Sequence, residues 1–429
     1  MERQLSFRHW MTFILAGLVG QFAWTIENMY LNRYVFFCTS NYNFIAPMVA
    51  CSAVAATVTT LLMGALSDRL GKRKLFISIG YILWGISIVA FSFFSPQFIK
   101  NITFIGVMIV VLDCVMTFFG STANDAAFNA FVTDVTTTKN RGKVESIISV
   151  LPLIAMLIMF GLCDGLVQGD NPQWILFYCL FGGITIVVGI ICLFLIPKDV
   201  AEPNRNEPYI KNIFYGFRPS VVKKNPMLYI VLIAFCVFNI GLQVYYPYFI
   251  VYVEHYLGIT ELKFTLTLGG VLLGACLITV VFGIFMDKIG KNKIMIPALI
   301  VNIIGAILMF FARSMAFIIP AGIVMMTGHM VSTSVLGAKI RDYTPEKETG
   351  LFQGVRMVFV VMIPMVTGPF IGRGVSYING HMETNDYGEM SIMPNQFIFL
   401  FAALMMILVV VPLLLLIKKE KEDEQKASE

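Results

Sequence analysis

Charge is scarce in this 429-residue sequence. Only 13% of the residues are charged, compared with about 25% in a typical soluble protein, whereas 58% are hydrophobic and the mean hydropathy is +0.79. This balance excludes an ordinary soluble domain and predicts a polytopic protein embedded in the lipid bilayer. The net charge of +5 does not indicate a nucleic-acid partner, because the cations lie in short loops between apolar runs.

The sequence also lacks the common enzyme motifs. It contains no P-loop, no GxSxG and no HExxH pattern, which argues against an enzyme and in particular against an ATP-driven pump. The eight cysteines are scattered through apolar runs without a CxxC pair, so we expect buried hydrophobic residues rather than disulfides or metal ligands. We therefore predict no catalytic residues, no metal site and no cofactor.

Long apolar segments make up most of the sequence. A membrane helix needs ~20 mostly apolar residues. Twelve segments qualify, at roughly 11–37, 44–66, 75–95, 102–132, 144–166, 173–196, 227–252, 264–286, 294–312, 316–338, 350–372 and 396–417. A polar, proline-rich stretch at 197–226 separates the first six from the last six. We predict an all-α integral membrane protein with helix bundles at 1–196 and 227–417, a cytoplasmic central loop at 197–226, and a solvated cytoplasmic tail at 418–429.

The cations indicate the topology. If both termini face the cytoplasm, about 25 of the 31 Lys and Arg residues fall on the cytoplasmic side, as the positive-inside rule requires. We therefore predict a multi-pass protein of the cell membrane with both termini in the cytoplasm.

An internal repeat relates the two halves. The charged turn Gly64–Lys74 returns, with Gly, Asp, a cation, Gly and Lys at the same spacing, as Gly283–Lys293. A second loop pair follows the fourth and tenth spans, where Asp134 and Asp342 precede a glycine by the same distance. Two repeated six-helix halves predict a substrate site between them and alternating access.

The Gly64–Lys74 segment, which we name the inner-gate turn, and its second copy resemble the loop signature of the major facilitator superfamily. The resemblance implies the major facilitator fold and a gating role for this turn. Its glycines permit a tight bend, and its Asp can satisfy a helix N-terminus. The alternative is a positive-inside turn without a gating role. The predicted gate residues are Gly64, Asp68, Arg69, Gly71, Asp287 and Gly290.

Within that superfamily, the first half resembles the glycoside–pentoside–hexuronide:cation symporter family. The resemblance is carried by Phe22-Ala23 and Met29-Tyr30-Leu31 in the first span and by Asp125-Ala-Ala-Phe128 in the fourth. By this resemblance, Asp125 stands at the position of the family's sugar-contacting carboxylate. Asn129 stands at the position of its sugar-stacking tryptophan.

Three positions depart from that family. Its sugar-binding aspartate in the first helix falls on Gln21, and its two sodium-binding aspartates fall on Ala56 and Thr60. The sodium site therefore lacks its carboxylates, which favours proton coupling.

Polar side chains form helical stripes within three spans, and such stripes must face water or another helix. They could bind substrate hydroxyls or pack between helices, and tyrosines near the outer end could instead belong to an interfacial belt. The candidate substrate-binding residues are Gln21, Thr25, Asn28, Ser121, Asp125, Asn129, Asn239, Gln243 and Tyr246, with Asn32 extending the first stripe.

Ionisable residues within the membrane are functional candidates by default. Glu27 is either the protonation site or a structural partner of Arg33 or a tyrosine. Asp113 either lines the outer cavity or is structural, with a slight preference for the structural role. The proton-coupling candidates are Glu27, Asp125 and Arg356. Arg356 could pair with either carboxylate when a cavity closes, or could anchor the inner gate.

These observations predict a secondary transporter that imports a sugar or glycoside with protons and functions as a monomer in the lipid bilayer. One alternative keeps the fold but changes the function to an exporter or a carrier of an amphipathic solute such as a drug or lysolipid. A second alternative is a membrane sensor that no longer transports.

Overall fold

The structure is a computed structural model, and its described part is helical almost throughout. It describes residues 5–136, 141–168, 171–197, 215–259, 263, 266–275, 277–278, 291–345, 349–378, 380, 382–384 and 390–428. The chain divides into two compact units, Met1–Tyr209 and Ile210–Glu429. The division falls within the polar stretch 197–226.

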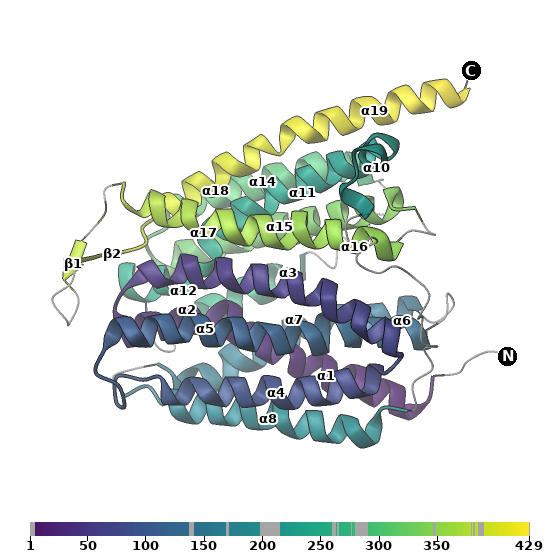
Figure 1. The fold of residues 1–429 in the computed structure, drawn as a ribbon. Coiled ribbons are helices and arrows are strands. Elements are labelled where there is room, and N and C mark those ends of the chain that lie inside the picture. Colours follow the sequence, from purple (N-terminus) through teal and green to yellow (C-terminus); the bar gives the residue numbers. More distant parts are fainter. Residues whose placement is uncertain are drawn as a thin grey trace. The chain divides into compact units, whose positions relative to one another are not determined.

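The long helices of unit 1 follow the apolar runs of the sequence (Figure 1). The first consists of α1 (Phe7–Thr25), η1 (Ile26–Tyr30) and α2 (Leu31–Thr39), and is followed by η2 (Tyr42–Phe44), α3 (Ile45–Leu70), α4 (Arg73–Ala90) and η3 (Phe91–Phe93). The fourth consists of α5 (Ile102–Gly120), η4 (Ser121–Phe128) and α6 (Asn129–Val135). The last two are α7 (Arg141–Ile158) with η5 (Met159–Cys163) and η6 (Asp164–Leu166), and α8 (Trp174–Leu195).

Unit 2 begins with two short elements, η7 (Tyr215–Phe217) and α10 (Pro219–Lys224). Its seventh span consists of α11 (Pro226–Tyr245), η8 (Tyr246–Tyr248), α12 (Phe249–Val251) and η9 (Tyr252–Tyr256). An apolar helix at Leu266–Ala275 precedes α14 (Lys291–Phe311) and α15 (Met315–Tyr343), and then α16 (Thr349–Met357), η11 (Val358–Met362) and α17 (Ile363–Ser376). The chain ends with α18 (Phe397–Leu408) and α19 (Val410–Ser428).

A small hairpin is the one departure from all-helical structure in the described residues. Strands β1 (Met382–Thr384) and β2 (Met390–Ile392) pair antiparallel, with Met382 opposite Ile392. The hairpin lies in the connection between α17 and α18, and it projects from the end of the helices in Figure 1.

Nine helices in the described residues are long and apolar enough to cross a membrane. Their outward faces are apolar, as α3 illustrates. Val54, Val58, Leu62 and Leu66 recur every four residues and are all exposed, so they form one continuous stripe along the helix. Such a stripe would be unfavourable in water and is compatible with lipid.

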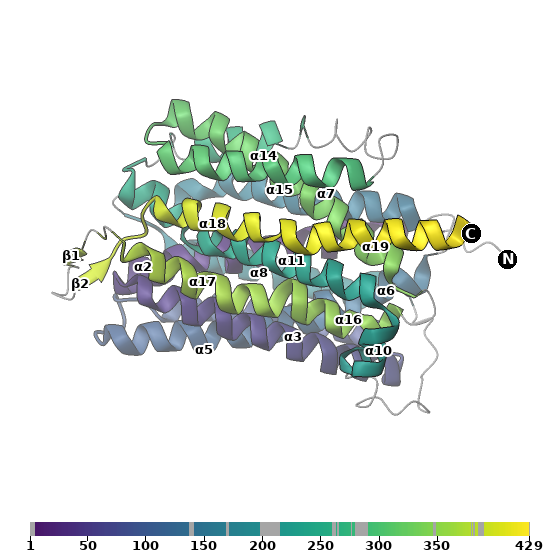
Figure 2. The ribbon, with the colours of Figure 1, turned by 90° about the horizontal axis from the view of Figure 1, so that it is seen from above.

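Glycines allow the closest helix contacts within each unit. Helices α4 and α8 lie side by side (Figure 1), and a Cβ atom on Gly85 would lie 2.6 Å from the carbonyl oxygen of Gly182. In unit 2, α14 and α15 lie side by side (Figure 2), and a Cβ atom on Gly305 would lie 2.3 Å from Cα of Met325. Small residues at such contacts replace the hydrophobic driving force that is missing between helices in lipid.

Five segments of the described chain are π-helical, namely η1, η4, η5, η9 and η11. A π turn contains an extra residue, which breaks the regular backbone ladder, and π turns are frequent at functional sites. Glu27 lies in η1 and Asp125 lies in η4. Two of the carboxylates singled out from the sequence therefore lie on irregular helix turns.

The C-terminal helix α19 is anchored to α15 through Glu420. The prediction of a solvated tail at 418–429 is therefore wrong for this residue. Lys339 of α15 is 3% exposed, and its Nζ lies 2.6 Å from Oε1 of Glu420. The hydroxyl of Tyr343, one turn further along α15, donates to the same carboxylate oxygen. The first part of the tail is thus a structural element of unit 2.

Replacing Glu420 with Gln should destabilise unit 2, because Lys339 would remain buried without a carboxylate partner. Loss of one partner from a buried ion pair costs about 3–5 kcal/mol, so we expect a clear fall in the midpoint of thermal unfolding in detergent. Glu422→Gln is the matched control, since Glu422 pairs with Lys418 at 3.9 Å on an exposed surface and such pairs contribute about 0–1 kcal/mol. Equal midpoints for the two variants would contradict the anchoring role.

Candidate functional site: buried polar networks within the helices

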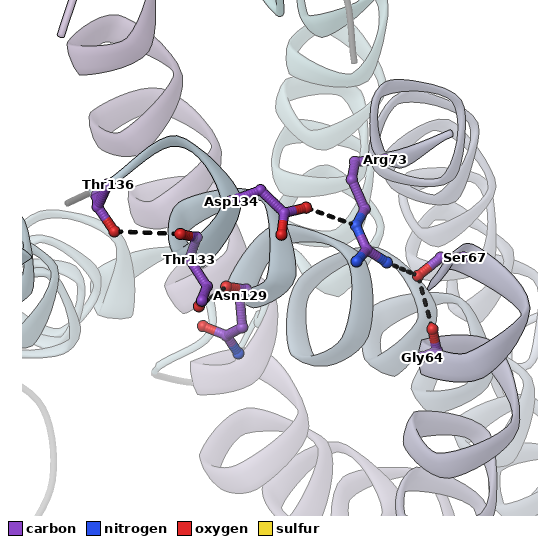
Figure 3. A network of polar contacts seen from close by, with 7 residues as sticks. All are labelled: Gly64, Ser67, Arg73, Asn129, Thr133, Asp134 and Thr136. Atoms are coloured by element: carbon purple, nitrogen blue, oxygen red, sulfur yellow. Dashed lines mark hydrogen bonds and ion pairs between the residues drawn. The ribbon is translucent and has the colours of Figure 1, made fainter. Parts of the chain in front are cut away.

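The inner-gate turn is held by a chain of hydrogen bonds (Figure 3). Gly71 adopts φ +61°, and its N–H bonds the carbonyl of Ser67 at 2.9 Å, which ends α3 with a left-handed residue that favours glycine. The Ser67 hydroxyl donates to the carbonyl of Gly64 at 2.9 Å and accepts from Nη1 of Arg73 at 2.5 Å. Nε of Arg73 in turn lies 3.0 Å from Oδ2 of Asp134 in α6.

This network joins the turn to the end of the fourth span. Arg73 is only 6% exposed, so its guanidinium needs the carboxylate of Asp134 and the hydroxyl of Ser67 as partners. Figure 3 shows the two ends of the network on different helices, with Arg73 between them. The arrangement fixes the spacing between the second, third and fourth spans on one side of unit 1.

The predicted gate residues are only partly within the described structure. Arg69 is exposed, and the Asp68 side chain lies outside the part that the structure describes. Asp287 and Gly290, from the second copy of the turn, also lie outside the described residues.

Sequence reasoning missed three members of this network as gate residues: Ser67, Arg73 and Asp134. Asp134 had already been noted as part of a repeated loop, and Arg73 is one of four cations in the turn. A buried arginine cannot be distinguished from its exposed neighbours by spacing alone. The aspartate that recurs after the fourth and tenth spans was the sequence feature that could have pointed to this network.

In the first helix, much of the predicted polar stripe bonds its own backbone. The Thr25 hydroxyl donates to the Gln21 carbonyl at 2.7 Å, and the Asn28 amide donates to the Trp24 carbonyl at 2.8 Å. Asn32 repeats the pattern by donating to the Asn28 carbonyl at 2.8 Å. Local bonds of this kind satisfy polar groups inside a membrane helix.

The fourth helix presents Asp125 on η4. Oδ2 of Asp125 accepts from the Ser121 hydroxyl at 3.0 Å, and the backbone carbonyl of Asp125 accepts from the Asn129 amide at 3.1 Å. Asp125 is half-buried and Asn129 is exposed. Within the predicted stripe, the side chains of Ser121 and Asp125 therefore bond each other, whereas the Asn129 side chain bonds the helix backbone. Oδ1 of Asp125 accepts no hydrogen bond from a described residue.

Asn124 fixes the π turn that carries Asp125. Its amide donates to the Tyr81 hydroxyl at 2.8 Å, which donates to the Ala16 carbonyl at 2.6 Å. Its carbonyl oxygen accepts from Nε1 of Trp24 at 3.4 Å. One buried amide thus connects α1, α4 and η4, and it holds the backbone next to Asp125 in place.

Glu27 is buried on the first helix, at 7% exposure. Its Oε1 accepts from the Thr117 hydroxyl of α5 at 3.0 Å, whereas its Oε2 has no hydrogen-bond partner among the described residues. Arg33 forms an ion pair with Asp164, with Nη1 at 3.1 Å from Oδ1. Sequence reasoning missed Asp164, although it is a carboxylate inside the predicted fifth span.

The candidates in unit 2 lie on and near α11. The Asn239 amide donates to the carbonyl of Val360 at 2.9 Å, within the π segment η11. A Cβ atom on Gly368 would lie 2.4 Å from Cβ of Gln243, so this glycine admits the Gln243 side chain. Tyr246 is half-buried at the start of η8.

Two basic residues of unit 2 have different surroundings. His329 stacks on Phe238 of α11 with ring centroids 5.3 Å apart and an interplanar angle of 9°, and its buried Nδ1 finds no hydrogen-bond partner in the described part of the chain. The predicted coupling residue Arg356 is exposed on α16.

Comparison with known proteins identifies the fold. The sequence profile of the Major Facilitator Superfamily matches residues 10–260 and 240–429. A search of curated proteins finds no matching sequence.

Solved transporters resemble the structure at low sequence identity. The nucleoside transporter NupG is similar with a TM-score of 0.70 and 12% identity, covering 95% of this chain and 98% of that chain. A D-xylose-proton symporter is similar with a TM-score of 0.71 and 15% identity, covering 95% and 97%. A bacterial homologue of the human lysosomal transporter Spinster, in an inward-facing and unoccupied conformation, gives a TM-score of 0.60 and 13% identity, covering 96% of each chain. Identities this low show the fold alone.

Arg73 and Asp134 should behave as an energetically coupled pair. Arg73→Gln and Asp134→Asn are each expected to destabilise the protein, and the double variant should lose less than the sum, with a coupling energy of about 0.5–3 kcal/mol. The measurement is unfolding in mixed micelles for all four proteins. Lys72→Gln removes an adjacent exposed cation and should have little effect. Strict additivity of the two losses would show that the pair does not hold the turn.

Proposed function

The chain belongs to the Major Facilitator Superfamily, and on this basis we propose that it imports a sugar or glycoside by proton-coupled symport. Membership of the superfamily indicates a transporter and not an enzyme. The proposed transport proceeds by alternating access, as in other transporters of this architecture. The finer assignment, to the glycoside–pentoside–hexuronide:cation symporters, is part of the proposal.

The observation that supports a sugar best is the environment of Asp125. One carboxylate oxygen accepts from Ser121 at 3.0 Å, and the other accepts from no described residue. A carboxylate in this state can accept hydroxyl hydrogens from a sugar through charge-assisted bonds, which are shorter and roughly twice as strong as neutral ones. Asn124 fixes the turn beside it, so the carboxylate is preorganised.

The rest of the proposed substrate site combines amides, hydroxyls and one aromatic ring. An amide both donates and accepts, which suits a sugar hydroxyl, and the flat ring of Tyr246 suits the apolar face of a pyranose. The proposed members besides Asp125 are Gln21, Thr25, Asn28, Ser121, Asn129, Asn239, Gln243 and Tyr246.

The proposed coupling ion is the proton. Ala56 and Thr60 stand where the related symporters have sodium-binding carboxylates, whereas Glu27 and Asp125 remain as protonatable groups in the helices. Protonation would neutralise a charge that otherwise opposes closure of the site around the substrate. Arg356 is proposed to assist coupling as the basic partner. A D-xylose-proton symporter among the similar structures is consistent with such coupling.

We place the protein in the cell membrane as a monomer, with both termini in the cytoplasm. This topology puts the inner-gate turn and its cations on the cytoplasmic side. The ion pair between Arg73 and Asp134 would then act at the inner gate, where it stabilises one arrangement of the helix ends. The proposed bundles are 1–196 and 227–417, with the central loop at 197–226.

One observation favours an amphipathic cargo instead. Thr25 and Asn28 use their hydrogen-bond donors on their own helix backbone, which leaves less polar capacity for a sugar. An exporter or a carrier of a drug or lysolipid on the same fold would need fewer polar contacts.

Replacing Asp125 with Asn should weaken sugar binding by about 10- to 100-fold, because hydrogen bonds to a charged group contribute about 1.5–3 kcal/mol. The measurement is ligand-induced thermal stabilisation across a panel of mono- and disaccharides, followed by counterflow of the best ligand in proteoliposomes. Tyr246→Ala should also lose binding. Glu422→Gln, on the exposed surface, serves as the control. If both site variants retain full transport of the cargo, the amphipathic alternative is supported and the sugar site is rejected.

Sugar accumulation should depend on a proton gradient and not on sodium. We expect uptake into proteoliposomes to rise when the outside is acidified, because the protonated carrier is the form that closes around the substrate. A sodium gradient at constant pH should have no effect. Uptake that follows sodium and ignores pH would overturn proton coupling while leaving sugar transport intact.

A further inference from the structure

Two buried carboxylates from different helices share one neighbourhood in unit 1. Glu27 of η1 is 7% exposed and Asp113 of α5 is 1% exposed. Each has an oxygen that finds no hydrogen-bond partner among the described residues, Oε2 in Glu27 and Oδ1 in Asp113. Thr117 lies one helical turn after Asp113 on α5 and donates to Oε1 of Glu27 at 3.0 Å, so both carboxylates belong to the same stretch of this helix interface.

The charged groups that act on Glu27 within the described residues are both acidic. They are Asp113 and Asp125. Arg33, on the same helix, is engaged by Asp164 at 3.1 Å. The described surroundings of Glu27 therefore add negative charge rather than compensate it.

Three other ionisable side chains lie near the two carboxylates. They are the thiol of Cys114 on α5, the thiol of Cys51 on α3 and the phenol of Tyr178 on α8. The hydroxyl of Ser52, also beside Asp113, donates to the carbonyl of Val49 at 3.2 Å. None of these groups supplies a positive charge.

Two ionised carboxylates in one buried site repel each other strongly, and neighbouring carboxylates commonly share a proton instead. A single proton would remove one of the two charges and form an O–H bond at one of the two unpartnered oxygens. A metal ion is a poorer explanation, since the described residues contain no group of three or more His, Cys, Asp or Glu side chains that could hold one.

We propose that Glu27 and Asp113 form a dyad that binds the single transported proton on one of its two unpartnered oxygens, Oε2 of Glu27 or Oδ1 of Asp113. The proton arrives from water, forms an O–H bond at one of these oxygens, and returns to water on the other side of the membrane. The charge of the dyad changes from −2 to −1 on loading, and no other bond forms or breaks.

The dyad explains how coupling could be enforced, and it rests on the proposed proton-coupled transport. An unloaded dyad with two charges can be tolerated only while water reaches it, so closure without a proton is strongly disfavoured. Asp125 is then left to bind the substrate, and the dyad takes over the coupling role. The proton would bind to Glu27 and Asp113, and the substrate would bind to Asp125. The two ligands would therefore use separate carboxylates.

Two variants should shift the pH dependence of sugar uptake in opposite directions. Asp113→Asn removes the neighbouring negative charge, so Glu27 binds the proton less tightly and the midpoint should move to lower pH by about one unit or more. Thr117→Val removes a donor to the ionised carboxylate, so the midpoint should move to higher pH. Cys114→Ala, next to Asp113 but neutral, should leave the midpoint in place. Two shifts in the same direction, or none, would overturn the dyad.

Counterflow separates failure of the dyad from failure of the proposed function. Wild-type protein should exchange labelled sugar in proteoliposomes, and absence of that exchange would reject sugar transport itself. Glu27→Gln and the double variant Glu27→Gln/Asp113→Asn should retain exchange but lose accumulation driven by a pH gradient. If both variants still accumulate sugar with the pH gradient, the proton is bound elsewhere and the dyad is wrong. Sodium-dependent stabilisation of the wild type that disappears in Asp113→Asn would also overturn it.

Discussion

The structure depends on one constraint, which is that a charge buried among packed helices has no water to solvate it. Each buried cation with a described ion pair meets a carboxylate from another segment of its own unit: Arg33 meets Asp164 at 3.1 Å, Arg73 meets Asp134 at 3.0 Å and Lys339 meets Glu420 at 2.6 Å. Such pairs rarely add net stability compared with apolar packing, but breaking one is costly. They therefore fix which helices are neighbours and where their ends meet.

The same constraint applies to the backbone, and the π-helical segments show how it is met. A π turn interrupts the regular ladder of carbonyls and amides, and side chains replace the missing partners. The carbonyl of Val360 in η11 accepts from the Asn239 side chain, and the carbonyl of Asp125 in η4 accepts from the Asn129 side chain. Irregular backbone near the middle of a membrane span is thus stabilised by the polar residues that the sequence places there.

Much of the fold was predictable, because long apolar runs in a chain with few charges leave little choice but membrane helices. The all-α major facilitator fold with twelve helices in two halves is confirmed, and so is the assignment to a transporter rather than an enzyme.

The contacts within the candidate site were harder to predict from the sequence. Helical stripes assume 3.6 residues per turn, which the π turns at Glu27 and Asp125 violate. Asp164 and Arg73 were missed because their importance comes from partners 131 and 61 residues away, and periodicity contains no information about such pairs.

The internal repeat predicts similar turns in the two halves, and the described ion pairs show how one helix end is anchored in each unit. In unit 1 the end of the fourth span is held by Arg73 from the inner-gate turn, and in unit 2 the end of the tenth span is held by Glu420 from the C-terminal helix. These two pairs are not repeats of each other, because the counterpart of Asp134 in the second half is Asp342 and not Lys339. Duplication can preserve the pattern of apolar runs and glycines because every membrane helix needs it. An ion pair can differ between the halves as long as each buried charge has a partner. The residues that anchor the helices therefore have to be established for each unit separately.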